Sequence, residues 1–394
     1  MTKSGAGGAG RGLGGYLTLF AALYGAYGAL SPFLPAFLGE RGASPQQITL
    51  FLAAATLTRL VGGPLAGRLA DRTGRTRTVL AASLALAAAS NLALIAGHDF
   101  WSLIAIGIVQ AVWTAPLAPL ADALALSAAR GGRAFEYGWV RASGSAAFIM
   151  ATILTGFLAD FWGSAAGLWV CGAAFAGAAV VATRVATSSH PHSHPEVMSG
   201  TMPSRSGFLA LVAIPAFRRV VLAAALVIGA HAMHDAFAVI VWREAEISSR
   251  TAGLLWSISV AAEILVFLSA GPWLLARIGP PGVIALAAFA GALRWAVQGA
   301  TTWLPALVAI QGLHGLTFAA LHLACLALIE RSVPDGLRAT ALGVYGALGL
   351  GLASALLTLA SGQLFGVFGI RAFWAMSALS LAAIPLALSL RAGK

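Results

Sequence analysis

Three ionisable side chains lie inside one long apolar segment, in the stretch GAHAMHDAF at residues 229–237. His231, His234 and Asp235 have i, i+3 and i+4 spacing, so a helix places them on one face. Charged groups are costly in hydrocarbon, and an ionisable residue within a membrane span is by default a functional hypothesis. We therefore expect this face to turn towards a water-filled cavity.

Other apolar segments carry groups that could bind a small solute. The planar guanidinium of Arg141 can bind a carboxylate through two hydrogen bonds, or a pair of hydroxyls when Asp122 also accepts from them. A structural ion pair between these two residues is the alternative. Tyr24 and Tyr27 lie three residues apart and could line the same pocket or simply pack as aromatics.

The composition predicts that the elements holding these residues lie in a bilayer. Of 394 residues, 59% are hydrophobic and only 9% are charged, whereas a soluble domain carries about 25% charged residues. The fold class predicted is an all-α integral membrane protein with twelve transmembrane helices. The apolar runs that predict these helices lie near residues 16–38, 46–70, 79–97, 101–129, 138–160, 164–185, 219–242, 251–276, 282–300, 303–329, 339–366 and 371–391.

The predicted helices form two sets of six. Residues 1–185 make the N-terminal half, residues 186–217 a flexible cytoplasmic linker rich in Ser, Pro and His, and residues 218–394 the C-terminal half. The segments GGPLAGRLADRTG and AGPWLLARIG occupy corresponding places in the two halves. Such a duplicated six-helix unit is the expected plan of a transporter in which two halves rock.

The charge distribution predicts that both termini are cytoplasmic. With that orientation most Lys and Arg residues fall on the inner side, and the outer loops hold only Arg41, Arg243, Arg250 and Arg371. Topology thus accounts for the net charge of +11, and no nucleic acid is needed as a partner. The sequence has no Gly-x4-Gly-Lys-Ser/Thr loop and no His-Glu-x-x-His motif, so neither ATP, a cofactor nor a metal is expected.

A short inner loop, GRLADRTGRTR, carries the most specific motif. Gly67 and Gly74 allow close helix approach and a tight turn, Asp71 can meet a helix N-terminus or an arginine, and Arg72 and Arg75 hold the loop on the inner surface. An ordinary positively charged inner loop is the alternative. In a twelve-helix chain this spacing resembles the signature of the major facilitator superfamily, which implies that these residues form a conformational gate.

Further stretches in both halves narrow the resemblance. They look like the 3-phenylpropionate transporter branch and, more distantly, the lactose permease group of proton symporters. The stretches are PLADALA, FEYGWVRASGSAAF, GAH with FAVIVW, VAAEILVF, LRWAVQGAT and LHGLTF. This resemblance implies a multi-pass protein of the bacterial inner membrane that works as a monomer, with a small molecule and protons as partners besides the lipid bilayer.

Residue by residue, the resemblance to lactose permease implies a substrate site. Asp122 and Arg141 match its acid and arginine that hold the substrate, and Phe148 falls where an aromatic ring stacks on it. His231 recurs in the phenylpropionate branch. Asp235 matches an acid that pairs with a lysine on the eleventh helix. That helix has no lysine here, so a neighbouring histidine becomes the expected partner of Asp235.

A second set of matching positions implies proton coupling, and Asp235 is assigned to the same role. Glu263, Arg294 and His314 match residues of lactose permease that carry coupling and binding. The acid three residues after the histidine is replaced by Thr317, which makes Glu263 the natural proton carrier. A static pair with Arg294 is the alternative. Trp256 lies seven residues before Glu263, shares its helix face and could pack against an aromatic solute.

The sequence therefore predicts secondary active uptake of a small organic solute, an aromatic carboxylate of the phenylpropionate type, driven by protons through alternating access. A sugar or nucleoside proton symporter is the main alternative. A transport-dead sensor and an intramembrane enzyme are weaker alternatives, and an enzyme is not expected because no catalytic motif is present.

Overall fold

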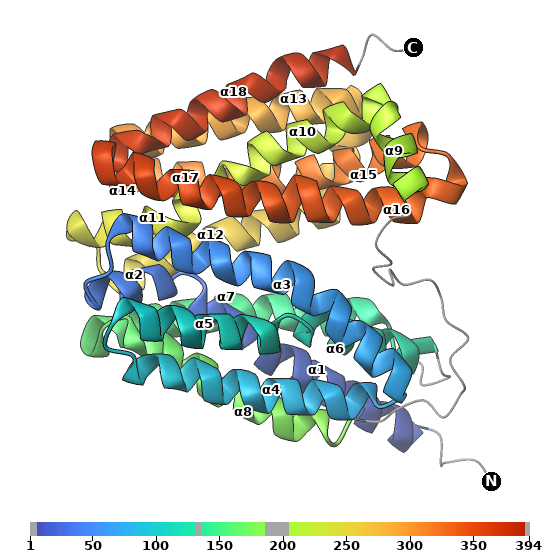
Figure 1. The fold of residues 1–394 in the computed structure, drawn as a ribbon, viewed down its shortest axis with the longest axis vertical. Coiled ribbons are helices and arrows are strands. Elements are labelled where there is room, and N and C mark those ends of the chain that lie inside the picture. The colour runs from blue at the N-terminus through green and yellow to red at the C-terminus, as the bar shows by residue number, and fades with distance from the viewer. Residues whose placement is uncertain (1–5, 131–134, 186–204, 391–394) are drawn as a thin grey trace. The chain divides into compact units, whose positions relative to one another are not determined.

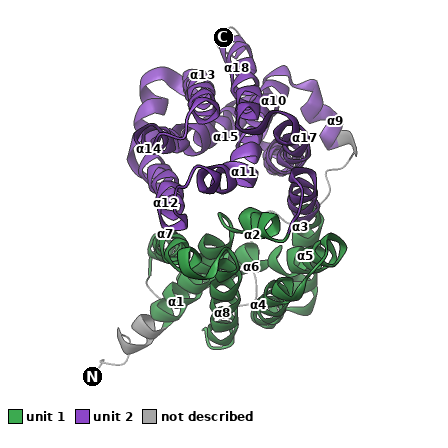
Figure 2. Cartoon of the chain, turned by 90° about the vertical axis from the view of Figure 1, so that its left-hand side faces the viewer, with its two compact units in different colours: residues 1–41, 58–199 green, residues 42–57, 200–394 purple. Residues whose placement is uncertain are grey.

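The computed structural model describes residues 6–130, 135–185 and 205–390, and within these ranges every regular element is a helix. The chain forms two compact units (Figure 2). The N-terminal unit holds residues 1–41 and 58–199, and the C-terminal unit holds residues 42–57 and 200–394.

The N-terminal unit is built around its first helix. Its helices are α1 (Ala6–Leu30), α2 (Leu34–Glu40), the second part of α3 (Pro45–Thr73), α4 (Thr76–Ala93), η1 (Leu94–Ala96), α5 (Phe100–Thr114), α6 (Leu117–Arg130), α7 (Tyr137–Trp162) and α8 (Ala165–Ala182). Helix α1 packs along α7 and α8, and α4 packs along α8 (Figure 1). Helix α1 comes close to α7 at Gly28, where an added Cβ would run into the backbone of Phe148. Small residues at such contacts let the backbones of membrane helices come together.

Side chains also tie the N-terminal helices through backbone carbonyls. Thr152 of α7 donates to the carbonyl oxygen of Gly28 over 2.8 Å. Asn91 of α4 donates to that of Leu168 in α8 over 2.8 Å. Both hydrogen bonds are buried, so each one fixes the position of one helix along the axis of the other.

Loop residues fix the helix ends that are predicted to lie outside. The carboxylate of Glu40 accepts from the backbone N–H of Ser164 at 3.1 Å and from its hydroxyl at 2.9 Å. Asp99 caps α5 by accepting from the backbone N–H groups of Ser102 and Trp101. Hydrogen bonds from Ser102 hold the pKa of the Asp99 carboxyl below its usual range.

The C-terminal unit holds most of the remaining helices. They are α9 (Arg205–Ala213), α10 (Pro215–Gly229), α11 (His231–Glu244), α12 (Ser249–Leu265), η2 (Val266–Ala270), α13 (Gly271–Ala300), α14 (Leu304–Gly312), η3 (Gly315–Ala320), α15 (Leu321–Ser332), η4 (Asp335–Leu337), α16 (Arg338–Val344), η5 (Tyr345–Leu352), α17 (Ala353–Phe368), η6 (Gly369–Ala372) and α18 (Phe373–Ser389). Helix α13 packs along α18, and α10 packs against α18 and α15. Phe237 of α11 stacks on Phe365 of α17 with ring centroids 4.1 Å apart.

The first turns of α3 pack with the C-terminal unit, although the helix continues without a break into the N-terminal one. Gly362 and Gly366 of α17 leave room for Thr49 and Gln46, because an added Cβ on either glycine would collide with those side chains. Residues 42–57 therefore belong to the C-terminal unit by their packing.

Several helices of the C-terminal unit depart from regular α geometry. Gly279 interrupts α13 with a φ of 68°, a left-handed conformation that glycine adopts without strain, and Pro280 follows it. Gly369 ends α17 with a φ of 54°. The segments η2, η3 and η5 are π-helical, a geometry that is rare and often occurs at functional sites.

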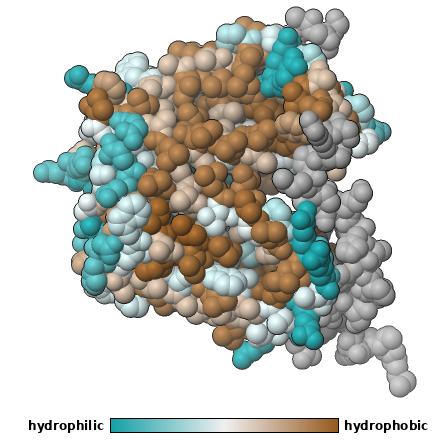
Figure 3. Space-filling model, in the orientation of Figure 1, coloured by the Kyte–Doolittle hydropathy of each residue, from teal (hydrophilic) through white to brown (hydrophobic). Residues whose placement is uncertain are grey.

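Ten helical stretches of the described residues are long and apolar enough to cross a membrane. On the face drawn in Figure 3, each unit presents apolar side chains along the middle of its helices and polar ones near their ends. Two stretches, Ser249–Ala300 and Asp335–Ser389, contain 52 and 55 residues, whereas one crossing needs about 20. The glycine breaks at residues 279 and 369 lie within these two stretches.

Two boundaries differ from the sequence prediction. Of the predicted linker, residues 186–204 lie outside the described residues, but residues 205–213 form α9 and α10 begins at Pro215. The predicted helix over residues 219–242 is divided at Ala230 into α10 and α11. Hydropathy alone could not show this division, because both parts lie within one apolar stretch, Pro215–Glu244.

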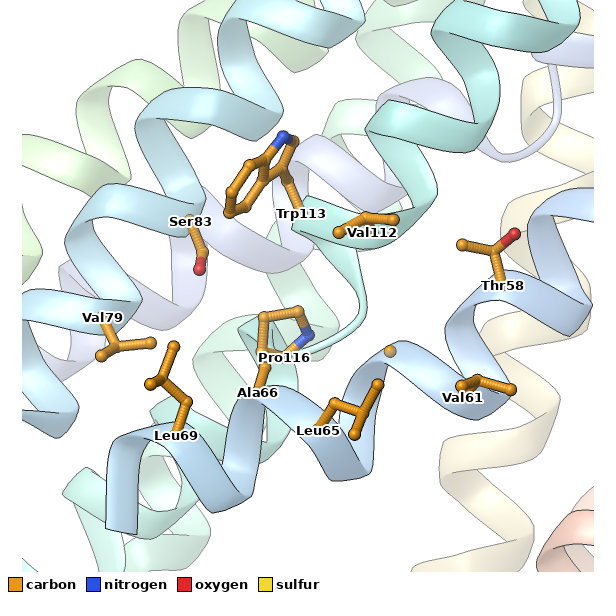
Figure 4. Close-up of a pocket in the computed structure, with 11 residues that line it drawn as sticks. Thr58, Val61, Leu65, Ala66, Leu69, Val79, Ser83, Val112, Trp113 and Pro116 are labelled. Carbon is orange, nitrogen blue, oxygen red and sulfur yellow. The ribbon is translucent and has the colours of Figure 1, made fainter. Parts of the chain in front are cut away.

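A mostly apolar cavity of about 510 Å³ lies in the N-terminal unit (Figure 4). Side chains of α3, α4 and α5 point into it. Its lining consists of Thr58, Val61, Gly62, Leu65, Ala66, Leu69, Val79, Ser83, Val112, Trp113 and Pro116. None of these residues is charged, so this cavity offers no anchor for an ionised solute.

Candidate functional site

Asp122 and Arg141 lie in one polar cluster of the N-terminal unit, but each binds a tyrosine. Asp122 of α6 accepts from the hydroxyl of Tyr137 over 2.7 Å. Arg141 donates to the hydroxyl of Tyr24, and its guanidinium carbon lies 4.6 Å from the Tyr24 ring centroid. Among the described residues no ion pair joins Asp122 to Arg141 within 4 Å. The structural ion pair, one alternative from the sequence, is therefore not formed, and substrate binding by these residues stays a prediction.

The two predicted pocket tyrosines have different surroundings. The Tyr24 and Tyr27 rings meet edge to face at 5.8 Å, and Tyr27 donates to the backbone carbonyl of Thr114 over 3.4 Å. Arg59 donates to the Thr114 hydroxyl over 3.3 Å. Tyr24 thus contacts Arg141 in the polar cluster, whereas Tyr27 and Arg59 both donate to Thr114 of α5.

Phe148 lies two turns after Arg141 on α7. Its backbone packs on Gly28 of α1, and its side chain is half-buried. The stacking of this ring on a substrate stays a prediction.

Arg294 is the most deeply buried charge of the C-terminal unit, with 0% of its surface exposed. Its Nη2 donates to Oε1 of Gln311 over 2.9 Å, and its Nη1 lies 3.0 Å from Nδ1 of His314. The guanidinium carbon lies 4.5 Å from the ring centroid of Trp295. Ser259 donates to the same Gln311 oxygen over 2.6 Å. In the described part of the chain no carboxylate lies within 4 Å of Arg294, and its Nε has no hydrogen-bond partner.

His314 lies between Arg294 and Glu263, and the structure thus brings three of the four predicted coupling residues together. Because a guanidinium can only donate, Nδ1 of neutral His314 must accept and its Nε2 must carry the proton. That Nε2 lies 3.6 Å from Oε2 of Glu263, whose side chain is 26% exposed. A direct static pair of Glu263 with Arg294 is not formed.

His231 is buried and fully hydrogen-bonded. Its Nδ1 lies 3.0 Å from the carbonyl oxygens of Val227 and Ile228, so it donates to them. Its Nε2 lies 3.0 Å from the hydroxyl of Thr317, which therefore donates to the neutral ring. Thr317, which replaces the acid of lactose permease, thus has a structural partner in His231.

His234 and Asp235 separate in exposure, although both were expected to face a wet cavity. The His234 side chain is 2% exposed and lies against Trp256, with ring centroids 4.9 Å apart. The Asp235 side chain is 61% exposed. A carboxylate costs more to bury than a neutral imidazole, which accounts for the difference. Nδ1 of His234 lies 3.5 Å from Oδ1 of Asp235, so His234 is the histidine next to this acid, but neither of its ring nitrogens makes a hydrogen bond.

Sequence reasoning gave no role to three residues of the two clusters. Tyr137 lies four residues before Arg141, a spacing that places both on one face of α7 and could have identified it. Gln311 lies three residues before His314, a spacing that places both on one face of a helix. Ser259 has no signal in the sequence, because its contact with Gln311 exists only in the packed unit.

The predicted gate loop forms a tight turn at the surface. Gly74 has a φ of 62° and joins α3 to α4. Asp71, Arg72 and Arg75 are exposed, and within the described ranges no hydrogen bond or ion pair reaches the Asp71 carboxylate. An added Cβ on Gly67 would meet nothing within 4 Å. The turn is present, while the gating role of these residues stays a prediction.

Comparison with known proteins gives the family. Residues 15–376 match the model of the MFS_1 like family. The chain is 31% identical over 377 residues to an Escherichia coli protein named "Probable 3-phenylpropionic acid transporter", covering 94% of this chain and 95% of that protein. It is 26% identical to the maltose permease of Geobacillus stearothermophilus, covering 86% and 84% of the two chains.

Solved structures share the fold. The nucleoside transporter NupG matches with a TM-score of 0.79 and 18% identity, covering 96% of this chain and 98% of that one. A D-xylose-proton symporter matches with a TM-score of 0.65 and 15% identity, covering 95% of each chain. Helices of membrane-spanning length, two polar clusters and these relatives lead to one conclusion: the chain belongs to the major facilitator superfamily and is a multi-pass membrane transporter, not an enzyme.

Proposed function

We propose that the chain is a proton-coupled importer of a small aromatic carboxylate of the phenylpropionate type, working by alternating access in the bacterial inner membrane. The observation that carries this proposal is the buried guanidinium of Arg294, whose polar contacts are all with neutral groups. The cycle uses the proton gradient alone, without a cofactor, and one copy of the chain suffices.

The surroundings of Arg294 support the proposal that the solute is an anion. A buried charge without an ion-pair partner is strongly unfavourable. Gln311 and His314 offer Arg294 hydrogen bonds without neutralising it, and Asp235 acts on it only from beyond ion-pair distance. A carboxylate is the natural counter-ion because it matches the planar fork of arginine. The Nε–H of Arg294 is buried and has no hydrogen-bond partner, so it is a donor that a solute could satisfy once a conformational change exposes it.

The aromatic side chains near Arg294 and Glu263 support a solute whose carboxylate is attached to an aromatic ring. Trp295 packs on Arg294, and Trp256 stands on the same face of α12 as Glu263. Flat apolar surfaces of this kind bind aromatic rings through stacked or edge-on contacts. The Escherichia coli relative that is named a probable 3-phenylpropionic acid transporter agrees with this class of solute.

Proton coupling is supported by the position of Glu263. This carboxyl is partly exposed and lies 3.6 Å from Nε2 of His314, which in turn contacts Arg294. A proton on Glu263 and an anion on Arg294 therefore act on one shared histidine. Such a contact offers a route by which one binding event changes the affinity for the other.

The positions of the helix breaks support twelve crossings with both termini inside. Dividing Ser249–Ala300 at Gly279 and Asp335–Ser389 at Gly369 gives two stretches from each, so the ten apolar stretches become twelve. Arg68, Arg72 and Arg75 then lie on the inner side, as the excess of inner positive charge requires.

A sugar or nucleoside proton symporter is the second candidate. The pairs Tyr137–Asp122 and Tyr24–Arg141 present hydroxyl, carboxylate and guanidinium groups that suit a hydroxylated solute. The similarity to a maltose permease also favours a sugar as the solute.

A thermal-shift screen of purified protein would test the proposal. We expect phenylpropionates to raise the melting temperature and sugars and nucleosides to leave it unchanged. Arg294→Lys keeps the charge but loses the fork, so the carboxylate should bind about 10- to 100-fold more weakly. Arg371→Gln, at an exposed position, is the control and should bind like the wild type.

Stabilisation by sugars alone would contradict the carboxylate proposal. Unchanged phenylpropionate affinity in Arg294→Lys would instead move the anion site to Arg141.

A further inference from the structure

Arg59 is a charged residue in the middle of a membrane-length helix, and the proposed function gives it no role. It is the central residue of α3, which runs from Pro45 to Thr73, so each end of the helix lies about 21 Å away along the axis. An arginine side chain is too short to carry its charge to either surface from that depth. Charged side chains in such places usually serve a substrate or ion site.

The side chain of Arg59 points into the N-terminal unit. Gly62 and Gly63 follow it by three and four residues and share its face of α3. An added Cβ on Gly62 would lie 3.3 Å from the Cβ of Ala115, so this face packs on the break between α5 and α6. At that break Nε of Arg59 donates to the hydroxyl of Thr114 over 3.3 Å.

The guanidinium of Arg59 still has donors without a protein partner. In the described part of the chain the bond to Thr114 is its only hydrogen bond, and no carboxylate lies within 4 Å of it. Unlike Arg294, this residue is exposed, so a solute can reach it in the present conformation. An acidic group is the partner that such a guanidinium lacks, because a carboxylate can accept two of its N–H groups at once.

Two tyrosine rings lie between Arg59 and Arg141. Tyr27 donates to the backbone carbonyl of Thr114, the residue whose hydroxyl Arg59 binds. The Tyr27 ring meets the Tyr24 ring at 5.8 Å, and the guanidinium carbon of Arg141 lies 4.6 Å from the Tyr24 ring centroid. The two arginines are therefore separated by a pair of aromatic rings.

Neither arginine has an ion-pair partner among the described residues. Asp122, the acid of this cluster, accepts from the hydroxyl of Tyr137 over 2.7 Å and lies beyond 4 Å from Arg141. One carboxylate is too small to reach both arginines past the two rings. Two carboxylates held apart by an aromatic ring would offer an acceptor to each arginine and a flat surface to the tyrosines.

We infer that the N-terminal unit selects aromatic dicarboxylates, with one acidic group bound to Arg141 and the other to Arg59. The solute ring lies against Tyr24 and Tyr27. Arg59 binds through its terminal N–H groups, while its Nε stays on Thr114. This inference rests on the proposed function, since it names which aromatic carboxylates the transporter prefers.

Binding of two probes by the purified protein would test this preference. The probes are 3-phenylpropionate and 3-(4-carboxyphenyl)propionate, which differ by one carboxylate on the ring. We expect the wild type to bind the dicarboxylate at least about tenfold more tightly, because hydrogen bonds between charged groups contribute about that much. Arg59→Gln should lose the preference and bind 3-phenylpropionate within about twofold of the wild type. Arg184→Gln, at an exposed position of the same unit, is the control and should keep the preference.

Arg59→Lys covers the case in which Arg59→Gln does not fold, because it keeps a positive charge at the same depth. It should bind 3-phenylpropionate normally and the dicarboxylate more weakly than the wild type, since lysine lacks the planar fork. Equal affinity of the wild type for the two probes would overturn the inference. So would an unchanged preference in Arg59→Gln with a lower melting temperature, which would leave Arg59 only a structural role at the end of α5. If the wild type binds neither probe, the proposed aromatic carboxylate solute itself fails, and that result is distinct from equal binding of both.

Discussion

At the scale of single residues, the charges of both candidate clusters are held by neutral partners. Asp122 accepts from Tyr137, Arg141 donates to Tyr24, and Arg294 donates to an amide oxygen and an imidazole. A direct ion pair would already be neutralised, whereas a charge on a neutral partner can still attract an oppositely charged ligand. Each cluster therefore holds a charge that no ion pair within 4 Å neutralises.

Glu263→Gln removes the proposed proton carrier while keeping the shape and hydrogen bonding of the side chain. We expect the variant to lose gradient-driven uptake and to keep solute binding and exchange, because the neutral amide resembles the protonated acid. Uptake of labelled solute into proteoliposomes with and without a pH gradient measures both activities. Glu244→Gln, at an exposed position, is the control, and normal accumulation by Glu263→Gln would rule Glu263 out as the carrier.

The residue types of the second cluster could be predicted from the sequence, but their contacts could not. Similarity to lactose permease correctly grouped Glu263, Arg294 and His314. The order in which they touch depends on ring orientation and packing, which no spacing rule gives. His234 was only one of two candidates for Asp235, and the structure decides between them by a distance of 3.5 Å.

At the scale of helices, the sequence predicts where apolar segments run and misses where they change geometry. The twelve apolar runs overlap the observed helices, since hydropathy and helix length are local properties. The division at Ala230 and the π-helical turns depend on tertiary packing, so periodicity does not reveal them. The short helix α9 within the predicted linker escaped detection because its 9 residues are too few to span a membrane.

Gly28→Ala tests the close contact of α1 with α7. Alanine favours a helix over glycine by about 1 kcal/mol, but its Cβ would collide with the backbone of Phe148, which cannot move aside. We expect a net loss of stability of about 1–3 kcal/mol, as for an overpacked core, measured as a lower melting temperature in detergent. Gly177→Ala, where a Cβ would meet nothing within 4 Å, should be neutral or stabilising, and equal behaviour of the two variants would contradict the packing argument.

At the scale of the whole chain, composition alone predicts a membrane protein. The two similar halves of the sequence predict a transporter in which two six-helix units rock. Membrane topology then determines which loops face each aqueous side. The proposed twelve crossings depend on the two glycine breaks, at residues 279 and 369, being turns at opposite surfaces.

Single cysteines at exposed positions would test that topology. Ile278→Cys and Thr78→Cys should react with a membrane-impermeant maleimide only after the cells are permeabilised. Trp303→Cys and Arg371→Cys should react in intact cells. The native Cys171 and Cys325 are buried and provide a low background. Labelling of position 278 in intact cells would contradict the twelve-helix arrangement.

The π-helical turns also bear on how the chain tolerates insertions and deletions. A π turn contains one residue more than the α turn that it replaces. Losing one residue from Val266–Ala270 would let the helix close with regular bonds, while the residues on either side keep their partners. Homologues are therefore expected to differ in length by single residues at this segment, at Gly315–Ala320 and at Tyr345–Leu352. An alignment that forbids gaps inside helices would then misplace the residues that lie between two such length differences.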